Sequence, residues 1–117
     1  MNTNTKKAII LLADGFEEIE AVIPVDLLRR AGVIVDLVTI SEDSPVVMGS
    51  RNIPIIANCN FSNIDTKADA IIIPGGMPGS KNLAKEPKVI QLIKDFYTNN
   101  KLICAICAAP AIVLAPT

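Results

Sequence analysis

The chain has 117 residues, of which 50% are hydrophobic and 20% are charged. This composition suits one domain with a modest buried core. Eleven basic and twelve acidic side chains leave a formal net charge of -1, so there is no basic excess of the kind that binds nucleic acid or anionic membranes. Small uncharged ligands are the expected partners.

The N-terminal apolar segment, residues 7–12, is expected to form a buried strand of a cytoplasmic protein. Lys6 and Lys7 precede it, as in a signal peptide, but the apolar run is short and Asp14 follows at once. The longest uncharged run, residues 102–117, contains two prolines and is shorter than the roughly 18 to 20 apolar residues of a membrane span. We therefore expect neither a signal peptide nor a membrane anchor.

A helix is predicted over about residues 17–31, ending at Gly32. Glu17, Glu18 and Glu20 crowd its first turn, where the helix dipole alone accounts for acidic residues on a wet surface. Glu20 has a second interpretation because it flanks an apolar stripe formed by Ile19, Ile23 and Leu27. Pro24 lacks the N–H that the Glu20 carbonyl would accept, so a distortion is expected there. A partly buried carboxyl in that position is a candidate proton carrier.

The middle of the chain predicts two more strands and a small antiparallel pair. Residues 33–40 and 69–73 are almost continuously apolar and rich in Ile and Val, as in parallel strands buried on both faces. Residues 46–48 and 53–56 are expected to pair as a hairpin or edge, because Pro54 cannot donate to a central ladder. The loop Pro74-Gly75-Gly76 is either a plain turn or a close approach of backbone N–H groups to a reacting oxygen.

A second helix is predicted over about residues 87–98, and a fourth strand over residues 101–106. Strands alternating with helices predict an open, doubly wound α/β fold with a mostly parallel sheet. Ligands bind such sheets at the carboxyl ends of the strands. Three loops leave strands at that edge, namely residues 14–18, residues 74–79 and the corner at Cys107.

The corner at Cys107 resembles a nucleophile elbow, in which an apolar strand turns sharply into an Ala-rich helix. Ala105 and Ala109 provide the small residues that this tight turn requires two positions on either side. A thiol at a helix N-terminus should ionise more readily than a free thiol, although Cys107 could also be a small core residue.

The other cysteines are expected to be packing residues. Cys104 and Cys107 form a C-x-x-C spacing, but on a strand they would point to opposite faces about 10 Å apart, too far for a disulfide. Three cysteines are also too few for a disulfide framework, which agrees with a reducing compartment.

Four motifs together closely resemble the ThiJ/PfpI superfamily, and within it the branch of the parkinsonism-associated protein deglycase and its bacterial homologues. They occur in order over almost the whole chain, at residues 13–26, 29–32, 73–76 and 105–110. The resemblance implies a flavodoxin-like sandwich, usually dimeric, with Cys107 as nucleophile. It also implies that a protonated Glu20 hydrogen-bonds to the thiolate, and that the amides of Gly76 and Ala108 form an oxyanion hole.

The activities that the resemblance implies need no metal or other cofactor. They are glyoxalase action on glyoxal or methylglyoxal, and removal of early adducts of these carbonyls from proteins and nucleotides. Alternatives within the family are an oxidative-stress sensor or chaperone that uses oxidation of Cys107, a peptidase-like enzyme, and an older thiazole-biosynthesis label. An inactive fold fragment is a further alternative.

The chain departs from the family pattern in two respects. It contains no histidine, so a Cys-His dyad cannot form within it, and family domains continue well beyond the elbow. We therefore expect residues 1–117 to be the N-terminal part of a single domain. The exposed sheet edge and helical face should then be covered by a separate C-terminal segment or another partner.

Overall fold

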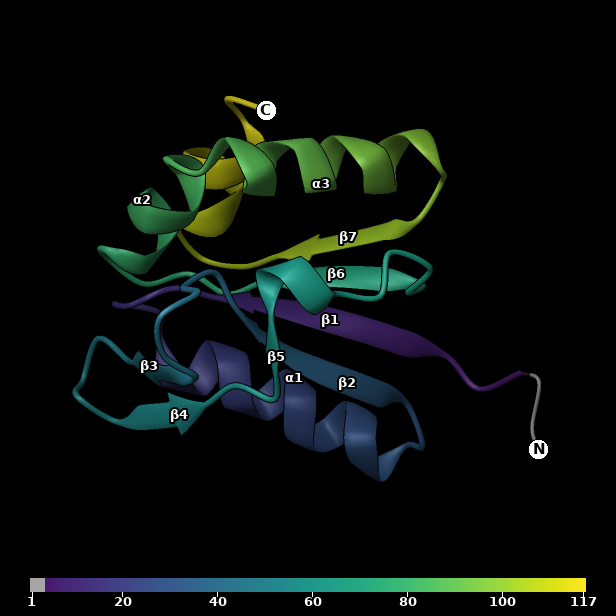
Figure 1. The fold of residues 1–117 in the computed structure, drawn as a ribbon, viewed down its shortest axis with the longest axis horizontal. Coiled ribbons are helices and arrows are strands. Elements are labelled where there is room, and N and C mark those ends of the chain that lie inside the picture. Colours follow the sequence, from purple (N-terminus) through teal and green to yellow (C-terminus); the bar gives the residue numbers. More distant parts are fainter. Residues whose placement is uncertain (1–3) are drawn as a thin grey trace.

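The computed structural model describes residues 4–117, which form a parallel sheet with helices on both faces (Figure 1). The sheet has the spatial order β5-β2-β1-β6-β7, and each neighbouring pair is parallel. Its strands are β1 (Lys7–Leu12), β2 (Ile34–Thr39), β5 (Cys59–Asn60), β6 (Ala70–Ile73) and β7 (Leu102–Ala105). The predicted doubly wound α/β fold is therefore confirmed.

The chain reverses its winding between β1 and β6. From β1 it continues outward to β2 and β5, and it then returns to the other side of β1 to add β6 and β7. In sheets of this kind the crevice outside the carboxyl ends of the strands at the reversal is the usual ligand position. The loops that follow β1, β6 and β7 all leave from this edge.

Two apolar layers enclose the central strand β1. Ile9 and Leu11 face a core that contains residues of α2 (Gly79–Ala84) and α3 (Pro87–Thr98), while Ala8, Ile10 and Leu12 face the other core, under α1 (Glu18–Arg30). The split follows from the two-residue alternation of side chains along a strand. Because β1 is buried on both faces, it lacks the polar alternation of a half-exposed strand.

The antiparallel hairpin, β3 (Val46–Met48) and β4 (Pro54–Ile56), forms as predicted beside the start of α1 (Figure 1). Helix α1 continues through Pro24 without a break. However, the apolar stripe faces outward: Ile19, Ile23 and Leu27 are 64%, 51% and 60% exposed. The stripe that flanks Glu20 therefore does not pack on the sheet, to which α1 presents Ala21 and Val25 instead.

A short 3-10 turn, η1 (Phe61–Asn63), follows β5.

The segment after the corner at Cys107 is shorter and wider than the predicted helix. Beyond Ala109 the chain forms the single π-helical turn η2 (Pro110–Leu114). The Ala115 N–H donates to the Pro110 carbonyl, five residues back. Val113 of this turn is fully buried, so η2 completes the core on the α3 side of the sheet.

Strand β7 ends the sheet, and no strand of residues 4–117 pairs with its outer side. Leu102 is 62% exposed, and apolar hollows of about 530 and 370 Å³ lie beside the strand, one lined by Ile103 and Tyr97 and the other by Leu102 and Cys104. No helix between residues 4 and 117 has the length and apolarity needed to cross a membrane.

Candidate active site

Three loops meet at the carboxyl edge of the sheet, as their positions in the sequence predict. The Glu17 N–H donates to the Gly75 carbonyl at 2.9 Å, and the Gly79 N–H donates to the Gly15 carbonyl at 3.2 Å. These two bonds join the loop after β1 to the loop after β6. The corner after β7 lies against the same place, because Gly75 also contacts the backbone of Ile106 and the side chain of Cys107.

Cys107 occupies the corner in a left-handed backbone conformation, with φ of 61°. Such a conformation is uncommon for a residue with a side chain and is typical of strained, functional positions. The Ala109 N–H closes the turn on the Ile106 carbonyl at 3.1 Å, and Ala109 itself is fully buried. Cys107 is exposed, so the alternative interpretation of this residue as a core hydrophobe is wrong.

Glu20 reaches the corner from α1 and is half-buried. Its Oε1 accepts the Gly75 N–H at 2.9 Å. A Cβ atom on Gly75 would lie 2.7 Å from this oxygen and 2.9 Å from the Cβ of Cys107. Both side chains therefore occupy the space that a side chain at position 75 would fill. Within residues 4–117 the structure records no direct hydrogen bond between Glu20 and the sulfur of Cys107.

The two predicted oxyanion-hole amides flank this junction. Gly76 has φ of 96°, which glycine adopts without strain. A Cβ atom there would also collide with the loop after β1. In the described part of the chain the N–H groups of Gly76 and Ala108 donate to no protein acceptor. Two unpaired amides near an exposed thiol are chemically suited to hold a developing negative charge on oxygen.

Glu18 is a residue that the sequence did not mark as special. It is 5% exposed, which corrects its interpretation as an acid on a wet helix end. Its Oε2 accepts the N–H groups of Arg51 and Ile53 at 2.8 and 3.1 Å. Burial raises the pKa of Glu18, but hydrogen bonds from the N–H groups of Glu18 itself, Ile53 and Arg51 together lower it below its ordinary value. The carboxyl is thus ionised at neutral pH.

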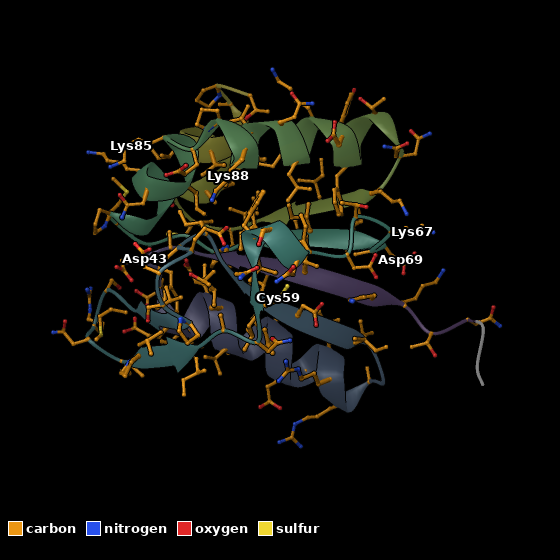
Figure 2. All side chains as sticks on the ribbon, in the orientation of Figure 1. Asp43, Cys59, Lys67, Asp69, Lys85 and Lys88 are labelled. Atoms are coloured by element: carbon orange, nitrogen blue, oxygen red, sulfur yellow. The ribbon has the colours of Figure 1, made fainter. Side chains whose placement is uncertain are left out.

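Cys59 and Cys104 are packing residues, as predicted. Cys59, the first residue of β5, lies in the middle of the view in Figure 2 and packs against the core under α3, while Cys104 packs against the core under α1. Burial raises the pKa of the Cys59 thiol, and the negative charge of Asp36 adds to that effect. Cys107 is therefore the cysteine that the fold presents to solvent.

The described residues offer no obvious metal site. Between residues 4 and 117, no group of three or more His, Cys, Asp or Glu side chains is placed to hold a metal ion.

Comparison with known proteins shows which family the chain resembles. The DJ-1/PfpI family model matches residues 6–117. The Parkinson disease protein 7 homolog of Danio rerio is 38% identical over 112 residues, covering 94% of this chain and 59% of the relative. The glutathione-independent glyoxalase DJ-1 of Schizosaccharomyces pombe is 36% identical over 110 residues, covering 87% of this chain and 58% of the relative.

A solved structure gives the same result in three dimensions. Oxidized Toxoplasma gondii DJ-1 superposes with a TM-score of 0.90 at 38% sequence identity, covering 96% of this chain and 61% of that one. The chain thus spans about three fifths of the length of the curated relatives described above.

Proposed function

The chain belongs to the DJ-1/PfpI family, and from this membership we propose that it is a cysteine-dependent glyoxalase or deglycase. Its substrates would be glyoxal, methylglyoxal and their early adducts with proteins or nucleotides. The observation that carries the proposal is the junction at Gly75, where Glu20 and Cys107 approach one glycine from two elements. The naming of the Schizosaccharomyces pombe relative as a glutathione-independent glyoxalase supports the reaction class.

The proposed reaction begins when the Cys107 thiolate adds to the aldehyde carbon of methylglyoxal. The S–C bond forms, and the carbonyl electron pair moves to the oxygen, which the N–H groups of Gly76 and Ala108 stabilise. A protonated Glu20 first gives its proton to this oxygen. The resulting carboxylate then moves a proton from the former aldehyde carbon to the neighbouring carbon, leaving a thioester. Water cleaves the C–S bond and releases lactate, so the net change is the addition of one water molecule and needs no external oxidant.

The decisive experiment measures lactate formation from methylglyoxal by the purified chain and by Cys107→Ser. We expect the substitution to reduce turnover by at least about a thousandfold, because the hydroxyl is a far weaker nucleophile than a thiolate at neutral pH. Cys59→Ser is the matched control and should retain turnover, since Cys59 packs against the core under α3 and not at the corner. Equal turnover by Cys107→Ser and the unaltered chain would remove Cys107 from the mechanism.

A second candidate function is a sensor of oxidants. The exposure of Cys107 next to a carboxyl favours it, and the related Toxoplasma gondii protein was solved in an oxidized form. Peroxide would supply the oxidant and convert the thiol stepwise to a sulfinate. A chain that forms no lactate, yet takes up two oxygen atoms at Cys107 in preference to Cys104, would favour this function over the glyoxalase.

We also propose that the protein pairs with a second copy of itself through the outward face of α1. Ile19, Ile23 and Leu27 make this face apolar, and Met48 and Ile53 extend it over the adjoining hairpin. Large exposed apolar patches mark interaction sites, and a two-fold axis lets one patch cover its own copy.

A further inference from the structure

The buried carboxylate of Glu18 joins two parts of the chain that are far apart in sequence. Glu18 lies at the start of α1, and its carboxylate binds the turn that connects β3 to β4. Besides the N–H groups of Arg51 and Ile53, it accepts the Ser50 hydroxyl at 3.4 Å. Gly49 lies so close that a Cβ atom there would collide with the carboxyl group. The turn is thus built around this side chain.

The same turn is bonded to the loop after β1. The Ser50 N–H donates to the Phe16 carbonyl at 2.7 Å, and the Gly15 N–H donates to the Met48 carbonyl at 2.8 Å. The Ser50 hydroxyl also reaches Glu17 at 3.3 Å. The loop after β1 is therefore held on one side by the hairpin turn.

On its other side this loop holds the glycine at the site. The Glu17 N–H donates to the Gly75 carbonyl, and the Gly75 N–H donates to Glu20, so both polar groups of the Gly75 backbone are bonded to the first turn of α1. Cys107 lies against the same glycine. A continuous set of contacts therefore runs from the hairpin turn through the loop after β1 to the thiol.

We propose that Glu18 is a positioning residue for the Cys107 site: by fixing the hairpin turn to the start of α1, it holds Glu20 and Gly75 in place beside the thiol. Glu18 does not touch the reacting atoms, and its effect passes through Glu17 and Gly75. The inference rests on the proposed function only in that it takes Cys107 as the reactive group.

The test measures the rate of alkylation of Cys107 by iodoacetamide between about pH 5 and pH 9, read from the Cys107 peptide by mass spectrometry. We expect Glu18→Ala to slow alkylation at neutral pH at least about threefold and to change the shape of the pH profile, because small misplacements of reacting groups are costly. Glu18→Gln should stay close to the unaltered chain, since its amide oxygen can accept the same two N–H groups. Asp43→Ala removes an exposed carboxyl elsewhere and is the control.

Gly49→Ala perturbs the same contact from the opposite side. Its new methyl group would displace the Glu18 carboxyl, so we expect slower alkylation from this substitution alone. In the Glu18→Ala background the collision is absent, so Gly49→Ala should add no further loss, and the two effects should be non-additive. Gly49→Ala keeps the Glu18 carboxyl, and Glu18→Gln keeps its shape. These two variants therefore still test the inference if Glu18→Ala fails to fold.

Three results would overturn the inference: an unchanged profile in Gly49→Ala, equal losses in Glu18→Gln and Glu18→Ala, or fully additive effects in the double variant. Alkylation does not require turnover, so failure of the proposed function can be distinguished from failure of the inference about Glu18. If the chain forms no lactate but the effects of Gly49→Ala and Glu18→Ala on alkylation are non-additive, Glu18 is still a positioning residue. If lactate forms in a Cys107-dependent reaction but the two substitutions have additive effects on alkylation, the inference about Glu18 is contradicted and the proposed function is not.

Discussion

At the scale of single residues, Gly75 is the position on which the site depends most. Its N–H and carbonyl bond to Glu20 and Glu17, and its missing side chain leaves room for Glu20 and Cys107 to approach. Its backbone does not need a left-handed conformation, in contrast to Gly76. The requirement for glycine here is therefore one of space.

Gly75→Ala tests this requirement. The new Cβ atom would lie 2.7 Å from Glu20 Oε1 and 2.9 Å from both the Cys107 Cβ and the Ile106 carbonyl oxygen. The last two atoms cannot easily move, so we expect the free energy of unfolding to fall by about 1 to 3 kcal/mol. Alkylation of Cys107 should slow as the corner shifts. Urea unfolding and peptide mass spectrometry measure the two effects.

Gly32→Ala is the control for this substitution. Gly32 has φ of 87° and open space around it, at the end of α1 remote from the corner. Its substitution should cost stability through backbone strain and leave the alkylation rate of Cys107 unchanged. A Gly75→Ala chain as stable and as reactive as the unaltered protein would show that the glycine is not needed for close approach.

Local sequence predicts the residues of the corner better than the residues that support it. Small residues around Cys107 and paired glycines after a buried strand have a direct physical cause in tight backbone turns. Glu18 has no such local cause, because its partners are backbone amides more than thirty residues away. An acid in the first turn of a helix is explained equally well by the dipole, so its burial becomes visible only in three dimensions.

At the scale of elements, periodicity predicts the long strands and helices well. The four main strands and the two long helices begin and end within one residue of the predicted positions. The short elements β5 and α2, with two and six residues, carry too little pattern to be predicted. The hairpin is predicted, but its attachment to the first turn of α1 depends on long-range contacts.

The orientation of α1 is the main error at this scale. Its apolar residues occupy two faces, and the sequence alone does not indicate which face packs on the sheet. Ala21 and Val25 pack there because small side chains allow the helix to lie close, which leaves the larger side chains outside. The larger side chains then need another partner, and a second copy of the chain would supply one.

Substitution of Ile23 by Glu tests the proposed pairing. Ile23 is 51% exposed in the middle of the outward face, so Ile23→Glu would place a charge at the centre of the contact. We expect sedimentation velocity to show a dimer for the unaltered chain and a monomer for Ile23→Glu. Tyr97→Glu is the control, because Tyr97 is exposed on α3, on the opposite face of the sheet, and should leave the dimer intact. A monomeric unaltered chain, or a dimeric Ile23→Glu chain, would contradict the pairing.

At the scale of the whole molecule, the candidate site lies at the carboxyl ends of the strands, and the outer side of β7 is left uncovered by residues 4–117. The loops after β1, β6 and β7 join at the carboxyl ends of the strands, as the doubly wound topology predicts. The outer side of β7, with Leu102 and two neighbouring apolar hollows, has no cover from residues 4–117. The expectation that a further segment or partner covers this side stays a prediction.

We infer that this fold turns one of three cysteines into a reactive thiol. Cys107 is exposed at a strained corner, whereas Cys59 and Cys104 pack against the two cores. Exposure alone would let Cys107 react first among the three. We also expect the thiol to be more reactive than a free one, because hydrogen bonds from the unpaired Gly76 and Ala108 amides and from a protonated Glu20 would favour its charged form.

The most direct measurement compares the iodoacetamide alkylation rate of each cysteine in the folded chain with that of glutathione, at about pH 6, where an ordinary thiol is almost fully protonated. The expected result is that Cys107 reacts faster than glutathione, that Cys59 and Cys104 react more slowly, and that the three rates converge in denaturant. Reaction of Cys107 at or below the rate of glutathione, or no faster than Cys59 and Cys104, would contradict it.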